Sequence, residues 1–144
     1  MKILSYNPDG YLPGIILDKD SEKFIISGKS CPEDAVEFYD PVFNWLEEYE
    51  ENPLENTVFD FKLTYFNTVS SKIIMMIMLR LEELNELGHP VKIRWFYPED
   101  DEDMEEAGED YKGMLEMDFE LISFEESDDD NDNDIANQLI DSIL

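Results

Sequence analysis

The stretch that decides the fold is residues 56–84, NTVFDFKLTYFNTVSSKIIMMIMLRLEEL, which passes from a β-like pattern to a helical one with no glycine or proline in between. Its first ten residues predict a strand with one drier face, because apolar residues alternate with Asp60, Lys62 and Thr64. The apolar set is Val58, Phe59, Phe61, Leu63 and Tyr65.

The second part of this stretch predicts a helix over Val69–Leu87. One buried stripe recurs every three or four positions and consists of Ile73, Ile77, Leu81 and Leu84. Gly88 and Pro90 follow and supply the stop, since glycine is favoured just after a helix and proline cannot continue one. A strand followed at once by an amphipathic helix predicts that the helix packs back on a sheet.

The flanking sequence extends this pattern in both directions. Residues 14–19 (GIILDK) and 23–28 (KFIISG) predict a β-hairpin. Residues 30–51 predict a helix that starts near Pro32, in which Phe38, Val42, Trp45 and Leu46 have helical spacing. Residues 91–97 and 115–124 predict two more strands, with a short helix over 104–111. The order ββαβαβαβ predicts a single α/β domain with a mixed sheet and helices on one or both faces.

The composition is sufficient for one domain, which we expect to span residues 1–126. The chain has 144 residues, of which 42% are hydrophobic. Residues 127–144 change abruptly to Asp/Asn repetition and are interpreted as an acidic tail. Within the tail Ile135, Leu139, Ile140 and Ile143 have helical spacing, which predicts a short amphipathic helix that docks on its own domain or on another chain.

The charge balance argues against nucleic-acid and membrane binding. Ten Lys and Arg stand against 37 Asp and Glu, a formal net charge of -27, so a clustered positive surface for phosphate groups is not expected. No signal peptide and no apolar run of about 20 residues is evident. With Cys31 as the single cysteine, we expect no internal disulfide, no metal site, no cofactor and a cytoplasmic location.

The junction between strand and helix carries the candidate site. Asn67, Thr68 or a nearby serine, Ser70 or Ser71, can cap the helix by accepting from its first amides. A second interpretation follows from spacing, because Thr68 and Lys72 share a face with Met75 and Leu79, opposite the buried stripe. Apolar residues on an outer face indicate either partner contacts or cover by a neighbouring loop of the same chain, and the helix start favours a negatively charged group such as phosphate.

Two motifs in this chain resemble a known family. They are Tyr-x-Asn-Thr-x-Ser-x-Lys, here residues 65–72, and Gly-x-Pro-Val-x-x-x-Trp-x-Tyr, here residues 88–97. With residues 30–49 and 115–122, they resemble the SiaC family of biofilm-regulation phosphoproteins, whose fold is similar to the STAS domain of anti-sigma factor antagonists. The resemblance covers nearly all of residues 10–122. The acidic tail and the density of acidic residues between Glu99 and Glu109 depart from the family core.

The resemblance implies a non-enzymatic switch regulated by reversible phosphorylation. In that family a dedicated partner kinase phosphorylates the junction threonine, and a PP2C-type phosphatase removes the phosphate. The unphosphorylated form binds and activates a diguanylate cyclase. The resemblance therefore implies that Thr68 is phosphorylated, with Asn67, Ser70, Ser71 and Lys72 supporting the junction.

The sequence also bears on three other classes of function. Catalysis is disfavoured because His89 lies in a Gly-His-Pro turn and Cys31 has no histidine partner in the sequence. The DDDNDND run fails as an EF-hand loop, since a loop starting at Asp128 has Asn133 and Leu139 where Gly and Glu are needed. An acidic binding module or DNA mimic, acting on a basic partner without phosphorylation, remains the alternative.

Overall fold

Strand β4 (Thr57–Phe66) lies in the middle of a six-stranded sheet in the computed structural model, which describes residues 1–125. The strands stand in chain order across the sheet. The other five strands are β1 (Leu4–Tyr6), β2 (Gly14–Asp18), β3 (Lys23–Ser30), β5 (Val91–Pro98) and β6 (Asp118–Phe124). Three helices connect the parallel strands: α1 (Ala35–Glu51), α2 (Thr68–Glu86) and α3 (Glu102–Met114). The predicted single α/β domain with a mixed sheet is confirmed.

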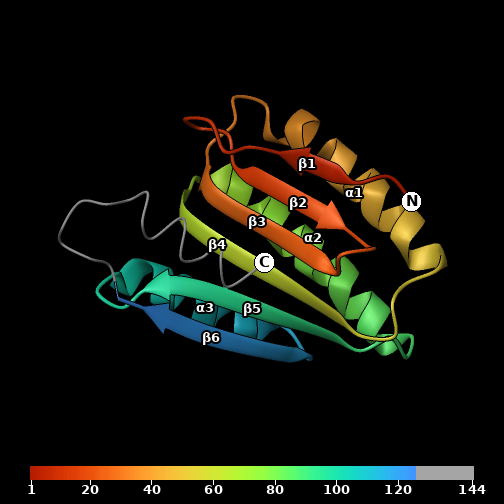
Figure 1. Cartoon of the computed structure of the whole chain (residues 1–144). Helices are drawn as coiled ribbons and strands as arrows, with labels where there is room; N and C mark the ends of the chain where they lie inside the picture. Colours follow the sequence, from red (N-terminus) through yellow and green to blue (C-terminus); the bar gives the residue numbers. More distant parts are fainter. Residues whose placement is uncertain (126–144) are drawn as a thin grey trace.

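The order of the strands explains where the helices lie. Strands β1, β2 and β3 are antiparallel, whereas β3, β4, β5 and β6 are parallel and each is joined to the next by one helix. Because parallel crossovers are right-handed and these three all step in the same direction, they place the helices on the same side. Figure 1 shows α1, α2 and α3 behind the sheet, so the opposite face has no helix over it within the described residues.

The hydrophobic core lies between the sheet and the three helices. Phe24 of β3 packs on Trp45 and Tyr49 of α1, and Trp95 of β5 packs on Tyr111 of α3. The predicted stripe of α2 is buried in full, and Ile74 and Met78 widen it. Glycine at position 108 lets α3 approach closely, because a Cβ there would lie 2.5 Å from both Trp95 and Leu121.

Several predicted boundaries differ in the structure. The helix expected from Pro32 begins at Ala35, because the Asp34 carboxylate caps it by accepting from the amide of Glu37 at 3.1 Å. The short helix expected over 104–111 is 13 residues long, since Asp101 caps it and acidic residues fill its first turn. The predicted hairpin of β2 and β3 is confirmed. Strand β1 was not predicted.

The face of the sheet without helices is expected to be exposed to solvent, but its centre is buried. Asp60 and Lys62 are buried on it. Arg94 donates two 2.6 Å hydrogen bonds to the Asp60 carboxylate, and the Lys62 ammonium lies 4.5 Å from the centroid of the Phe96 ring. Burial is the main cause that lowers the pKa of Lys62. Val58, which was grouped with the drier face, lies on this face and is exposed, because side chains alternate along a strand.

Two further predictions concern the chain ends and membranes. The amphipathic tail helix predicted over 135–143 lies outside the described residues, and the domain boundary at residue 126 stays a prediction. Within residues 1–125, no helix is long and apolar enough to cross a membrane.

Candidate functional site at the start of helix α2

The junction between β4 and α2 is fixed by Asn67. Its side-chain Oδ1 accepts a hydrogen bond from the backbone amide of Ser70 at 2.9 Å, which is the geometry of an N-cap. Its own amide donates to the carbonyl oxygen of Ser30 at 3.2 Å, so the start of α2 is tied to the end of β3. Of the capping residues that the sequence leaves open, the structure therefore selects Asn67.

Thr68 is the first residue of α2 and is exposed. Its hydroxyl has no hydrogen-bond partner among the described residues, and its carbonyl oxygen accepts from the Ser71 hydroxyl at 2.6 Å. Lys72 is also exposed and lies one turn further along the helix. The Thr68 hydroxyl is thus accessible and is not used to hold the helix.

A buried chain of hydroxyls lies beneath this helix start. The Ser70 side chain is fully buried and accepts from Ser30 at 2.9 Å, and Ser30 in turn lies 2.7 Å from the Tyr39 hydroxyl. Burial raises the pKa of Tyr39 to about 12, with the hydrogen bond to Ser30 opposing the shift. These contacts join β3, α1 and α2. A further bond from the Tyr111 hydroxyl to the carbonyl of Ser71, 2.8 Å long, adds α3.

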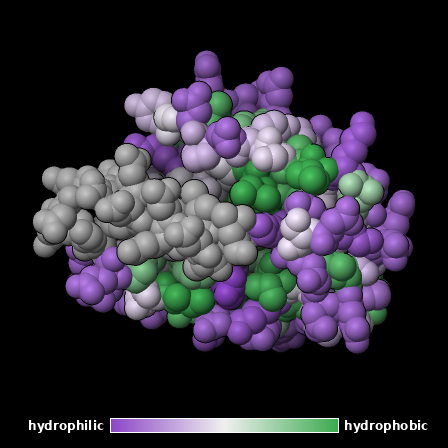
Figure 2. All heavy atoms as spheres, in the orientation of Figure 1, coloured by the Kyte–Doolittle hydropathy of each residue, from purple (hydrophilic) through white to green (hydrophobic). Residues whose placement is uncertain are grey.

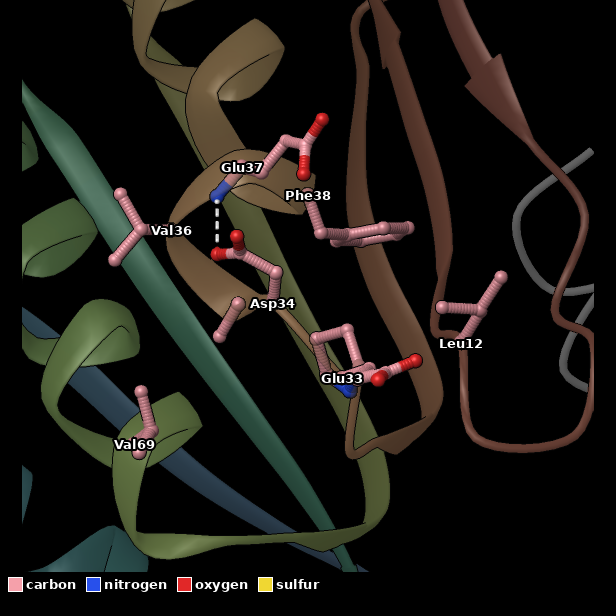
Figure 3. A pocket seen from close by; sticks show the side chains of 9 residues that line it. Leu12, Glu33, Asp34, Val36, Glu37, Phe38 and Val69 are labelled. Carbon is pink, nitrogen blue, oxygen red and sulfur yellow. Dashed lines mark hydrogen bonds between the residues drawn. The ribbon is translucent and has the colours of Figure 1, made fainter.

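An open cleft of about 800 Å³ adjoins the junction. It lies between the first turns of α1 and α2 and the β1–β2 connection. Figure 3 shows apolar side chains and carboxylates on its walls. The cleft is lined by Leu12, Pro32, Glu33, Asp34, Ala35, Val36, Glu37, Phe38 and Val69. Its lining combines apolar side chains with carboxylates, which suits a partner segment with apolar and basic side chains.

The structure places the predicted site residues in different environments. Ser70 is turned inward, as expected, and Leu79 is 41% exposed. Met75, which was expected to look outward, is instead half-buried against the core, whereas its neighbour Met76 is 54% exposed. The stripe of α2 that faces the core is wider than the four predicted residues. It includes part of Met75, so the exposed face begins at Met76 and not at Met75.

The cleft residues were missed by sequence reasoning. Val36 and Val69 are 70% and 52% exposed. Each lies in the first turn of a helix, α1 for Val36 and α2 for Val69, with polar neighbours in the sequence. An isolated exposed valine is unremarkable in a sequence. These residues form one surface only because the C-terminal ends of β3 and β4 bring the starts of α1 and α2 together.

The remaining chemistry of the described residues does not form a second site. Within residues 1–125, no three His, Cys, Asp or Glu side chains are arranged to hold a metal ion. His89 takes part in the stop of α2 through its amide, which donates to the carbonyl of Leu84 at 3.3 Å. The amide of Cys31 donates to the carbonyl of Tyr11 at 2.8 Å.

The fold and the site together define a single-domain α/β regulatory protein built around a strand-to-helix junction. The chain belongs to the SiaC family of regulatory phosphoproteins, since the model of that family matches residues 7–124. It is therefore a regulatory and non-catalytic protein, and the predicted family is confirmed.

Similar proteins support this assignment. An uncharacterized protein of Pseudomonas aeruginosa strain UCBPP-PA14 is 32% identical over 117 residues, which are 79% of this chain and 90% of that protein. The crystal structure of apo-SiaC from Pseudomonas aeruginosa matches with a TM-score of 0.78 at 28% identity, covering 85% of this chain and 100% of that one. A second structure is that of the diguanylate cyclase SiaD in complex with its activator SiaC, from the same species. There the match has a TM-score of 0.80 at 28% identity over 84% of this chain and 99% of that chain.

Proposed function

We propose that this protein is a switch that binds and activates a diguanylate cyclase when Thr68 is unphosphorylated, and thereby controls biofilm formation. A partner kinase adds phosphate to Thr68 and a PP2C-type phosphatase removes it. The single observation that carries the proposal is the state of Thr68: its hydroxyl is exposed at the helix start, and Asn67 supplies the cap. The solved complex of a relative with a cyclase supports the choice of partner.

Phosphate on Thr68 is compatible with the fold. The first amides of α2 and the ammonium of Lys72, four residues on, both favour a negative group at this position. The modification adds about -1.5 to -2 charges, which is small beside a net charge of -27. Its effect on function must therefore be local, at the surface where the partner docks.

The cleft gives the local effect a physical basis. Three carboxylates, of Glu33, Asp34 and Glu37, already line it next to Val69. A phosphoryl group on the neighbouring residue would add bulk and a further anion, which must be desolvated when a partner covers the cleft. A hundredfold loss of affinity needs only about 2.7 kcal/mol, which is within the cost of burying an unpaired charge.

The first test is phosphosite mapping by mass spectrometry on the protein isolated from its own cells, with a Thr68→Ala chain alongside. Thr64 is a matched control, because it is an exposed threonine on β4 only four residues before Thr68. We expect phosphate on Thr68 and not on Thr64, and loss of the modified peptide in Thr68→Ala. A chain that stays unmodified under all growth conditions would instead favour the acidic binding module.

The second test measures binding and cyclase activation by Thr68→Glu and Thr64→Glu chains. We expect Thr68→Glu to bind the cyclase about a hundredfold more weakly and therefore to activate it less, so that the cyclase forms less product. Thr64→Glu should bind and activate the cyclase like the unchanged protein. Equal binding by both variants would contradict the switch. If the unchanged protein and both variants all fail to bind a cyclase, the proposed partner is wrong.

A further inference from the structure

One row of side chains on helix α2 faces away from the core and is exposed along most of the helix. Its members recur at alternating spacings of three and four residues. They are Val69, Lys72, Met76, Leu79, Glu83 and Glu86, and together they form the outer row of α2. The alternation is that of positions a and d in a coiled coil, at which one helix packs along a second helix.

The first part of the outer row is apolar although it is exposed. Val69, Met76 and Leu79 are 52%, 54% and 41% exposed. The rise along the axis from Val69 to Leu79 is about 15 Å, which is about three turns of a helix. A surface helix usually presents polar residues on this side, whereas an exposed apolar row at this spacing is typical of a surface that binds another helix.

The outer row continues into the cleft beside the junction. Val69 belongs to both, and Figure 3 shows it on the first turn of α2, with Val36 on the first turn of α1. Val36 is 70% exposed and also lines the cleft. The apolar surface available to a partner therefore runs from Leu79 along α2 to the start of α1.

Charges are distributed unevenly along this surface. Carboxylates lie at both ends, and they belong to Glu33, Asp34 and Glu37 in the cleft and to Glu83 and Glu86 on α2. Lys72 lies between them and forms no ion pair within the described residues. Because charges of opposite sign across an interface select the partner and its register, the surface fits a helix with an apolar stripe, basic residues toward both ends and a carboxylate in the middle.

The helix-free face of the sheet is less suited to a partner helix. Where Figure 2 shows this face, its hydrophobic residues are interrupted by hydrophilic ones. At its centre the Arg94 guanidinium is already paired with the Asp60 carboxylate at 2.6 Å.

We infer that the outer row of α2 from Val69 to Leu79, with the adjoining cleft, binds one amphipathic helix of the partner, and that Lys72 sets the register by pairing with a carboxylate of that helix. The inference rests on the proposed function, because it describes how the cyclase controlled by Thr68 is bound. Thr68 lies one turn before Lys72, so a phosphoryl group on Thr68 would pair with the Lys72 ammonium and withdraw it from the partner.

Binding of the cyclase by two methionine variants tests the docking surface. Met114, the last residue of α3, is 58% exposed and is a matched control for Met76. We expect Met76→Glu to bind the cyclase about tenfold more weakly and Met114→Glu to bind like the unchanged protein, with the melting temperature retained in both. Equal binding by the two variants would overturn the docking surface and leave the switch at Thr68 standing. A cyclase that does not bind even the unchanged protein would overturn the proposed partner and the inference with it.

A photo-crosslinker identifies what occupies the surface. Benzoylphenylalanine in place of Met76 should cross-link to a helix of the cyclase, and the same residue in place of Met114 should not. A cross-link from position 76 that maps to a strand or a loop of the cyclase would overturn the helical occupant.

Exchange of charges tests the role of Lys72. Lys72→Glu should weaken cyclase binding about tenfold, and replacement of one glutamate or aspartate of the cross-linked helix by lysine should restore it. If no such replacement restores binding, Lys72 does not set the register.

Discussion

Asn67 and Thr68 are neighbours, and the structure assigns them different tasks, which can be separated by their effects on stability. Asn67→Ala removes the acceptor for the Ser70 amide, whose residue is fully buried. Loss of an N-cap lowers the free energy of unfolding by about 1 kcal/mol. Here the loss should be closer to about 2 kcal/mol, because the Ser70 amide would be left without a partner and shielded from water. At roughly 4 °C per kcal/mol for a domain of this size, the melting temperature should fall by about 4–8 °C.

Thr68→Ala should not lower the stability of the fold, in contrast to Asn67→Ala. Its hydroxyl makes no hydrogen bond within the described residues, and alanine has a higher helix propensity than threonine by about 0.5 kcal/mol. The free energy of unfolding, measured by urea denaturation followed by circular dichroism, should therefore stay level or rise slightly. Asn67→Asp is the control that keeps the acceptor and should remain near the unchanged protein. If Thr68→Ala costs as much as Asn67→Ala, the threonine caps the helix and the argument that it is free for modification fails.

Three further predictions concern packing, pH and the outer face of α2. Gly108→Ala should cost about 1–3 kcal/mol in urea denaturation because its methyl group would overlap Trp95, whereas Gly113→Ala, with open space around it, should be neutral or stabilising by up to about 1 kcal/mol. Equal stability of the two variants would mean that α3 does not approach the sheet so closely. Because the pKa of Tyr39 is raised from 10.0 to about 12, its hydroxyl stays protonated in the fold while the unfolded chain ionises. Stability should therefore fall between pH 10 and 12, and Tyr39→Phe should make that fall shallower when unfolding is measured across this range. Leu79→Glu should weaken partner binding without loss of stability, whereas Met75→Glu should lower the melting temperature because that side chain packs on the core; unchanged binding of Leu79→Glu would remove it from the interface.

The candidate site could be predicted only in part. The position of Thr68 follows from the change of period within residues 56–84, because the last residue of a strand and the first of a helix can be located by pattern. Which residue caps the helix could not be decided, since Asn, Thr and Ser all accept from amides. The choice depends on backbone geometry: Asn67 has an extended conformation, with φ of -84° and ψ of 177°, and its side chain turns back to Ser70.

Met75 shows a limit of spacing arguments. Four-and-three spacing places it on a line with Thr68 and Lys72, but the width of the buried stripe depends on what packs on the helix. Because α2 packs on the sheet and also on α1, its buried side extends as far as Met75. Exposure of Met76 and burial of Met75 are thus set by neighbours that are distant in the sequence.

The sequence by itself determined the alternation of strands and helices from β2 onward, because periods of 2 and 3.6 are local properties of the chain. It also located the junction between β4 and α2 and indicated the family. Tertiary structure alone decided three things. Strand β1 has only three residues and exists because it pairs with β2 while Trp45 donates to the carbonyl of Lys2 at 2.8 Å. The placement of all helices on one face follows from strand order, and strand order results from contacts between distant residues. The cleft beside Thr68 arises where the starts of α1 and α2 meet, and no local pattern encodes that meeting.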